Sequence, residues 1–463
     1  MPDLATRADV SRLYGRAAFG ATRADLDTWQ GQPYDAVVDA LFPPGPPGTI
    51  GRLPQIDEVE QISQESQTQD VYAAIRWWLE RMLETPYPLE ERMTLFWHDH
   101  FATAFLGEPD VGMLMLQNRT LRQHALGSFR SLANAMTTDA AMLYWLNGIA
   151  NRVDGVNENY AREFLELFTL GVVPQVYTET DIREAAKAFT GFLVNTSTRT
   201  FQFVPTRHDA SVKTVLGRRV GGHLPGSPQE ALEYQEVTEA ALAHDGGKTA
   251  SRFLAYKLVQ QFGYPVTPAD ATTDVLIQDV AWAIRAGDKW DLRKGVRTLL
   301  THPKWRYADP AAGKRLVRSP VETVVHAAKV LGFPKTNVYG SLYWPQQIQF
   351  MLERAGQVPF LPPNVGGWQS GLGWLSQTTN LGRYDVLSVL AQYLHNLALQ
   401  YALPLPASGD LDGWAVYMGL ASFSTNTKLR LQQYLADPQT LDEVQKQLSM
   451  FVLVGTSPDW QVM

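Results

Sequence analysis

Two histidines and an aspartate form the first group of side chains that could do chemistry. His98, Asp99 and His100 are consecutive at the end of a stretch with helical periodicity. On an ideal helix the two imidazoles would lie about 200° apart, so they could share one metal ion only where the helix frays. The alternative is structural, with one histidine capping the helix and the other hydrogen-bonded in the core. The pattern permits a metal site without requiring one.

A second group lies in a segment that departs from the helical pattern. His208 and Asp209 are adjacent, and Lys213 follows four residues after Asp209. A histidine beside an aspartate can bind a metal, act as a general base oriented by the carboxylate, or form a turn. All three interpretations stay open from the residues alone.

A third group consists of three glutamates around one arginine on a single helical segment, namely Glu158, Arg162, Glu163 and Glu166. Crowded carboxylates can bind a cation, but the informative arrangement in helical bundles is Glu-x-x-His, which is missing here. The competing interpretation is ion pairing between positions i and i+4, worth about 0.2–0.5 kcal/mol per pair, or a buried ion network or anion clamp.

The fourth group lies in residues 359–374, which are rich in Pro, Gly and Trp. This composition cannot form a regular helix and predicts a structured loop that shapes a surface. Asn364, Trp368 and Trp374 could form the rim of a site for a sugar, a peptide or an aromatic group. A rigid packing corner is the alternative.

Several familiar catalytic signatures are missing. The chain has no His-Glu-x-x-His, Gly-x-Ser-x-Gly or Gly-x-Gly-x-x-Gly sequence, and Leu242 stands where a phosphate-binding loop before Gly247-Lys248-Thr249 would need glycine. The absence of cysteine excludes disulfides, thiol catalysis and thiolate ligands. Any strong metal ligand must therefore be His, Asp or Glu.

The elements that position these groups are mostly helical. Residues 157–191 predict two short helices, the first with an apolar face and the carboxylates opposite. Gly171 suits the left-handed end of the first helix, and Thr178 to Asp181 suits the start of the second. The same periodicity predicts helices over residues 9–42 in two parts with Thr22 as the second cap, 69–84, 88–101, 114–125, 129–136, 140–146, 229–243, 249–262, 269–285, 291–300, 321–331, 346–355, 383–402, 427–435 and 441–451.

Only one region predicts strands. Residues 200–204 and 213–216, followed by glycines, suggest a short β-hairpin. We therefore predict a mainly α fold, a single compact, mostly helical domain over residues 1–463, with one small β-hairpin insertion near residues 200–222. Residues 43–68, a Pro/Gly run followed by polar residues, predict a flexible loop.

Charge and hydropathy exclude some functions. The 463 residues carry a formal net charge of −7 and no run of five or more Lys/Arg, which argues against nucleic-acid binding. The first residues lack the apolar core of a secretory signal, and no 18 uninterrupted apolar residues occur. We expect no transmembrane segment and a cytoplasmic location for the sequence as written.

The motifs resemble those of a bacterial family, domain of unknown function 1800. The resemblance rests on these segments: Asn157 to Glu163 with Glu166 to Gly171, Phe96 to Phe101, Ala188 to Gly191, His208-Asp209 with Lys213 and Leu216-Gly217, Pro362 to Trp368, Arg16 to Gly20, and Thr249 to Phe262. They span almost the whole chain, but the family's name records no established biochemistry. The family usually has Asn where this chain has Asp99, and many relatives carry an export signal, which implies export if this sequence has been trimmed.

These observations lead to an enzyme as the first hypothesis. We predict a metal-dependent hydrolase whose site is assembled from three segments that carry the resemblance, with Zn, Mn or Fe as the divalent metal. The predicted metal ligands are His98, His100, His208 and Glu158, and the predicted catalytic residues are Glu163, Glu166, Arg162, Asp209 and Lys213. Asn364, Trp368 and Trp374 are predicted to bind substrate.

The rival hypothesis is a non-enzymatic scaffold or binding protein. Here the same polar residues form a salt-bridged core, and the Pro/Gly/Trp loop holds a partner. Members of the family are often encoded beside a second family, domain of unknown function 1501, which is similar to sulfatases and alkaline phosphatases and would supply that partner. Carbohydrate binding at Trp368 and Trp374 is a third possibility. Unpaired His and carboxylate groups around a cavity would favour the enzyme, and paired Arg and Glu groups would favour the scaffold.

Overall fold

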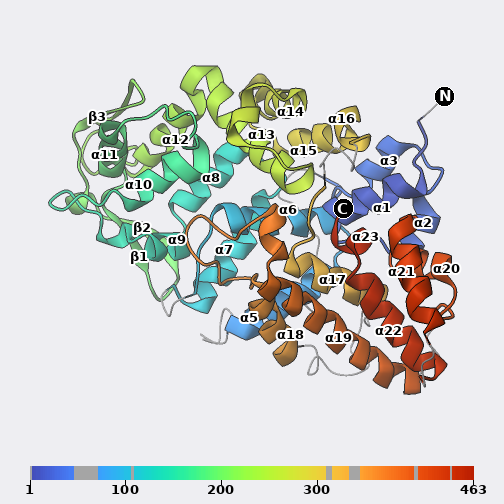
Figure 1. Ribbon diagram of the computed structural model, residues 1–463. Coiled ribbons are helices and arrows are strands. Elements are labelled where there is room, and N and C mark those ends of the chain that lie inside the picture. Colours follow the sequence, from blue (N-terminus) through green and yellow to red (C-terminus); the bar gives the residue numbers. More distant parts are fainter. Residues whose placement is uncertain are drawn as a thin grey trace.

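The computed structural model describes residues 3–45, 71–105, 109–308, 315–332, 345–400, 405–437 and 441–463. Within these ranges the protein is mainly α-helical with two small antiparallel sheets, which confirms the predicted fold class (Figure 1). Most of the predicted loop at residues 43–68 lies outside the described residues. No helix within the described ranges is long and apolar enough to cross a membrane.

The first third of the chain is helical from its start. Its helices are α1 (Arg7–Ala17), α2 (Arg23–Trp29), α3 (Tyr34–Asp39), α5 (Val71–Glu84), α6 (Pro88–His100), α7 (Val111–His124), α8 (Phe129–Thr137) and α9 (Ala140–Trp145). Thr22 caps α2 as predicted, because its hydroxyl accepts from the Asp25 N–H while the Asp25 carboxylate accepts from the Thr22 N–H.

The predicted pair of helices in residues 157–191 is confirmed. After the short turn η1 (Gly148–Ala150), helix α10 (Asn159–Glu163) continues as a wider π-helix, η2 (Phe164–Thr169), and α11 (Glu179–Ala188) follows. Gly171 has a φ of +82° at the end of the first helix, and Thr178 forms a capping box with Asp181 at the start of the second. A π-helix leaves some main-chain groups without their usual partners.

The β insertion contains two hairpins rather than one. Strand β1 (Phe192–Asn195) pairs with β2 (Thr200–Phe203), and after η3 (Pro205–Arg207) strand β3 (Val212–Val215) pairs with β4 (Arg218–Gly221). The two predicted strands thus belong to different hairpins. Leu216 and Gly217, with φ of 52° and 74°, form the two-residue turn between β3 and β4, where both central residues need positive φ.

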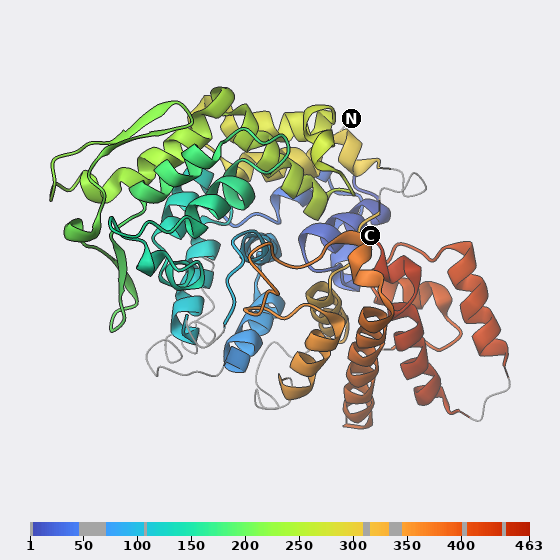
Figure 2. The same ribbon diagram turned by 60° about the vertical axis from the view of Figure 1, so that its left-hand side comes forward.

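The remainder of the chain returns to helices. They are η4 (Glu230–Leu232), α12 (Glu233–Ala243), η5 (His244–Gly247), α13 (Lys248–Phe262), η6 (Pro268–Thr272), α14 (Val275–Arg285), η7 (Ala286–Asp288), α15 (Leu292–Thr301), α16 (Pro303–Arg306), α17 (Pro320–Val330), α18 (Pro345–Ala355), η9 (Gly371–Leu375), α19 (Gln377–Gln400), α20 (Leu411–Tyr417), α21 (Thr425–Ala436), α22 (Glu443–Gly455) and α23 (Pro458–Gln461). In both ribbon views the N-terminal helices lie beside the C-terminal ones (Figures 1 and 2).

Helix α6 lies between the two main apolar clusters. Phe96 and Trp97 belong to the cluster built mostly from α1–α3 and α7–α16, whereas Leu95 belongs to the cluster built mostly from α5 and α17–α23. Almost every side chain of α6 is buried, including those of Glu91 and Arg92. Burying charges is costly unless they are paired, so α6 requires ionic partners from its neighbours.

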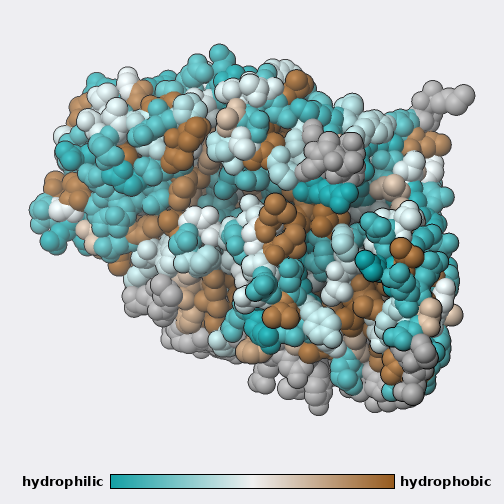
Figure 3. Space-filling view, viewed as in Figure 1, coloured by the Kyte–Doolittle hydropathy of each residue, from teal (hydrophilic) through white to brown (hydrophobic). Residues whose placement is uncertain are grey.

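Those partners are arginines and one further glutamate. Glu91, with a fully buried side chain, accepts from Arg81 at 2.8 Å and is also paired with Arg122, and Arg92 pairs with Glu322 of α17 at 2.6 Å. These charged pairs fix the position of α6 inside the protein. On the face of the molecule shown in Figure 3, hydrophobic residues form small groups among hydrophilic ones.

Candidate functional site

His98 connects α6 to the loop that precedes α19. Its Nε2 accepts the Phe360 N–H at 3.0 Å, and the ring is packed against Trp78, Phe360 and Trp368. A neutral imidazole has one lone pair, so with Nε2 accepting a hydrogen bond the ring has none left for a metal. Burial lowers the pKa of His98 to about 3, which keeps the ring neutral.

His100 makes a different connection. Its Nε2 lies 3.0 Å from the Phe168 carbonyl oxygen, so Nε2 carries the hydrogen and donates to the π-helix η2. Aromatic rings surround it, and burial together with the nearby charge of Lys257 lowers its pKa to about 3. The positive charge of Lys257 also opposes a cation at the free Nδ1. His98 and His100 thus join α6 to two distant segments.

His208 belongs to a fully buried group with Glu233 and Lys213. Lys213 Nζ lies 2.6 Å from Glu233 Oε2, and His208 Nε2 lies 3.2 Å from the same oxygen. His208 Nδ1 lies 2.9 Å from the Thr190 carbonyl oxygen, which can only accept, so Nδ1 carries a hydrogen. Both ring nitrogens are therefore occupied by protein partners.

This buried group holds the β insertion on α12. Burial raises the pKa of Glu233, but the hydrogen bonds from His208 and Lys213 outweigh burial and hold that pKa below its usual range. Asp209 points elsewhere, because its carboxylate accepts from the Ser211 N–H at 2.9 Å and from the Ser211 hydroxyl. The turn interpretation of Asp209 is the one the geometry fits.

The glutamates around Arg162 form an ion network at the surface. Arg162 lies 3.4 Å from Glu158, 3.5 Å from Glu166 and 2.7 Å from Glu179. Glu163 is half-buried, and burial together with the charge of Glu166 raises its pKa. Arg162 and Glu158 contact α11 through Glu179 and Arg183, whereas Phe168, whose carbonyl oxygen meets His100, is buried.

The three segments form no recognisable metal centre within the part of the chain that the structure describes, where no group of three or more His, Asp or Glu side chains lies so that it could hold a metal ion. His98 Nε2 accepts a main-chain hydrogen bond, and both ring nitrogens of His208 lie beside protein partners. Glu158 and Glu166 pair with Arg162, which is the i,i+4 pairing that the sequence offered as the alternative. The metal centre therefore stays a prediction.

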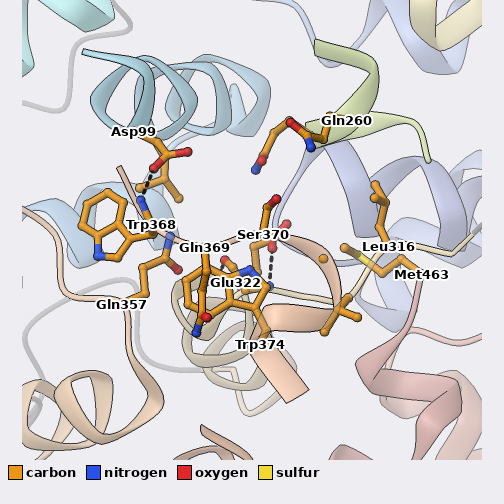
Figure 4. Close-up of a pocket in the computed structure, with 15 residues that line it drawn as sticks. Asp99, Gln260, Leu316, Glu322, Gln357, Trp368, Gln369, Ser370, Trp374 and Met463 are labelled. Carbon is orange, nitrogen blue, oxygen red and sulfur yellow. Dashed lines mark hydrogen bonds between the residues drawn. The ribbon is translucent and has the colours of Figure 1, made fainter. Parts of the chain in front are cut away.

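A pocket lies where the ends of α6 and α13 meet α17 and the loop before α19. It is lined by Leu95, Asp99, Gln260, Gln261, Leu316, Val317, Ser319, Glu322, Gln357, Trp368, Gln369, Ser370, Gly371, Trp374 and Met463. Figure 4 shows Asp99 and Trp368 on one side and Leu316 and Met463 on the opposite side. About 40 Å³ admits the centres of water molecules, which is room for about three waters.

Asp99 ties this loop to α6 and also lines the pocket. Its Oδ1 accepts the Trp368 N–H at 2.7 Å (Figure 4). The contact requires glycine at position 367, since φ there is +81° and a Cβ would lie 2.2 Å from Asp99 Oδ1. Among the described residues Oδ2 has no hydrogen-bond partner. Trp368 and Trp374 thus line the pocket, whereas Asn364 accepts from the Gly366 N–H and is not among the residues that line it.

Glu322 closes the inner side of the pocket. Its Oε2 accepts the Ser319 N–H at 2.6 Å in a capping box, and its other oxygen pairs with Arg92. Two more buried arginines, Arg318 and Arg383, lie close enough for Glu322 to influence their pKa, yet burial lowers both pKa values to about 10. Sequence analysis missed Glu322, although Ser-Pro-x-Glu before an apolar run is a recognisable capping signal.

The ionisation of Asp99 gives a prediction about pH. Burial raises its pKa to about 6, against the opposing effects of Lys257 and the Trp368 N–H. Since an unfolded aspartate titrates near 3.9, the folded state binds more protons between about pH 4 and 6, and wild-type stability from this group falls as pH rises through that window. Asp99→Asn keeps an oxygen for the Trp368 N–H and removes this loss.

We expect Asp99→Asn to match wild type below about pH 4 and to exceed it by about 1–3 kcal/mol above pH 6. Urea unfolding from pH 4 to 8 measures the difference. A variant less stable than wild type at pH 8 would mean that the Asp99 carboxylate is compensated by a cation.

The fold and the pocket define a large, mainly α-helical protein in which His98 and Asp99 hold a Pro/Gly/Trp loop over a polar pocket. The chain belongs to the family described as Protein of unknown function (DUF1800), which matches residues 12–462. No curated protein and no solved structure matches the chain. Function must therefore be argued from the pocket itself.

Proposed function

We propose that this is a binding protein that holds a small polar ligand in the pocket beneath the loop of residues 359–374. The observation that carries the proposal is a set of polar groups around one cavity that have no partner among the described residues. They include Asp99 Oδ2, the amide nitrogen of Gln357 and the side chain of Gln369. Binding sites are typically concave with a few convergent polar groups.

The contacts of the residues predicted to bind metal or to act in catalysis support binding over metal-dependent hydrolysis. His98, His208 and Lys213 are hydrogen-bonded within the core, and Arg162 pairs with glutamates. Position 99 works for binding with either Asp or Asn, because both can accept the Trp368 N–H and offer a second polar atom.

A ligand screen by thermal unfolding tests the proposal. A ligand that binds only the folded protein stabilises it by about 2.7 kcal/mol at a hundredfold excess over Kd. We expect wild type and Leu372→Trp to be stabilised by the same compound and Ser370→Trp to be unaffected. Ser370 lines the pocket, whereas Leu372 lies on the same loop, is 80% exposed and does not line it. Equal stabilisation of all three proteins would place the ligand elsewhere.

The enzyme remains a second candidate for one reason. Asp99, with a pKa of about 6 and one oxygen without a protein partner, has the properties of an acid–base group at neutral pH. Elemental analysis of protein purified without chelator tests the metal-dependent form of this hypothesis. Stoichiometric Zn, Mn or Fe that is lost in His98→Ala and His208→Ala, with both variants folded, would support hydrolysis over the binding proposal.

A protein partner from the domain of unknown function 1501 family also remains a proposal. The support for this partner is the family resemblance, and the loop of residues 359–374 would be the surface that contacts it. Co-purification of the two proteins, with wild type compared to Leu372→Trp, tests it. Loss of the complex in this exposed variant would place the partner on the loop.

A further inference from the structure

The chemistry of the pocket wall restricts the ligand further, on the basis of the proposed binding function. The wall contains two carboxylates, Asp99 and Glu322, and the described residues that line it include no Lys, Arg or His. An anion would therefore meet acceptors and negative charge. Glu322 is already paired with Arg92 and hydrogen-bonded to Ser319 N–H, so it offers little to a cation either.

The groups without protein partners both donate and accept. The Gln357 carbonyl oxygen accepts the Val321 N–H at 3.1 Å, which leaves its NH₂ group as a donor towards the pocket. Gln261, Gln369 and Ser370 also line the wall, and their side chains make no hydrogen bond within the described residues. Asp99 Oδ2 adds an acceptor. An apolar ligand would leave all of these groups unpaired, which is costly.

Hydroxyl groups match this wall. Each hydroxyl donates one hydrogen bond and accepts others, so it can satisfy an amide NH₂ and a carboxylate oxygen together. The space for about three waters suits the hydroxyls of one edge of a sugar ring, each replacing a water, and Trp368 and Trp374 supply the apolar walls that suit ring C–H groups.

We propose that the pocket binds the terminal unit of a neutral carbohydrate. Asp99 and Gln357 receive its hydroxyls on one side, Gln261, Gln369 and Ser370 complete the polar contacts, and the two tryptophans border the ring. The opening then leaves the rest of a longer glycan outside, because the water-sized space is too small for more than one edge of a sugar.

Calorimetric titration of the full chain tests this inference. The probes are glucose, galactose, mannose and N-acetylglucosamine with their β-linked disaccharides, compared with glucuronate as an anion, glucosamine as a cation and inorganic phosphate. We expect saturable binding of at least one neutral sugar, a loss of affinity of at least about tenfold in Ser370→Trp, and unchanged affinity in the matched variant Leu372→Trp.

The outcomes separate this inference from the proposed function. Binding of glucuronate, glucosamine or phosphate in place of every neutral sugar, with loss in Ser370→Trp, would overturn the carbohydrate while leaving a binding pocket. Neutral-sugar binding that survives in Ser370→Trp would place the sugar outside this pocket and overturn the inference. Absence of binding by every probe, together with a negative ligand screen, would remove both proposals.

Discussion

Glu91→Gln is expected to destabilise the protein by about 3–5 kcal/mol, because breaking a buried ion pair leaves uncompensated charge in the core. The Glu91 side chain is fully buried and is paired with Arg81 and Arg122, while the Trp78 indole N–H donates to it at 2.9 Å. Burial raises the pKa of Glu91, but the two guanidinium groups outweigh it and hold the pKa below the usual range. Urea unfolding at pH 7 measures the loss.

The lowered pKa also fixes the pH dependence of this effect. A carboxyl group with a depressed folded pKa stabilises the protein above its unfolded pKa of about 4.3, and this contribution disappears as pH falls through the folded value. The difference between wild type and Glu91→Gln should therefore shrink in acid.

The matched control is Glu179→Gln, which removes an ion pair with Arg162 at the surface. The Glu179 side chain is 68% exposed, and exposed pairs contribute little. We expect its unfolding midpoint to equal that of wild type. An unchanged midpoint in Glu91→Gln as well would show that the arginines around Glu91 find other partners or water.

Glu233→Gln is expected to lower the free energy of unfolding by a similar amount, about 3–5 kcal/mol, with the loss concentrated in the β insertion. Glu233 is the shared partner of Lys213 and His208, and all three side chains are fully buried. Its neutralisation leaves the Lys213 ammonium group without a counter-charge. Hydrogen exchange of the amides in β3 and β4, followed beside global unfolding, should show faster opening of this segment than of α6.

Glu236→Gln serves as the control on the same helix. Glu236 also contacts a histidine, His223, and accepts the Gly221 N–H at 2.8 Å, but its side chain is 38% exposed. Because water can replace these contacts, we expect a much smaller loss. Equal effects in Glu233→Gln and Glu236→Gln would contradict a charged, buried Lys213–Glu233–His208 group.

Both predictions express one property of this fold. Polar side chains of the kinds common in active sites connect separate segments of the chain inside this protein. Glu91 and Arg92 hold α6, His98 and Asp99 hold the loop before α19, and His208 holds the β insertion. Buried polar networks of this kind have to be fully satisfied, and they confine the packing to few arrangements. The pocket is one place among the described residues where several polar groups lie around a cavity without protein partners.

The sequence by itself determined the secondary structure well where periodicity and caps were strong. The helices before and after Gly171 and the caps at Thr22 and Thr178 follow from local rules that act over a few residues. Strand pairing was partly missed, because β1 directly follows α11 and is only four residues long. The loop at residues 359–374 followed from its Pro and Gly content.

Tertiary structure alone decided which polar residues meet. Sequence spacing placed His98 and His208 in segments that carry the family resemblance, but it could not show that Phe360 and Glu233 would be their partners, 262 and 25 residues away. The pocket likewise joins Asp99, Gln261, Glu322 and Trp368 from four parts of the chain. Such contacts depend on how α6 is packed between two apolar clusters, which is a property of the whole chain rather than of any local pattern.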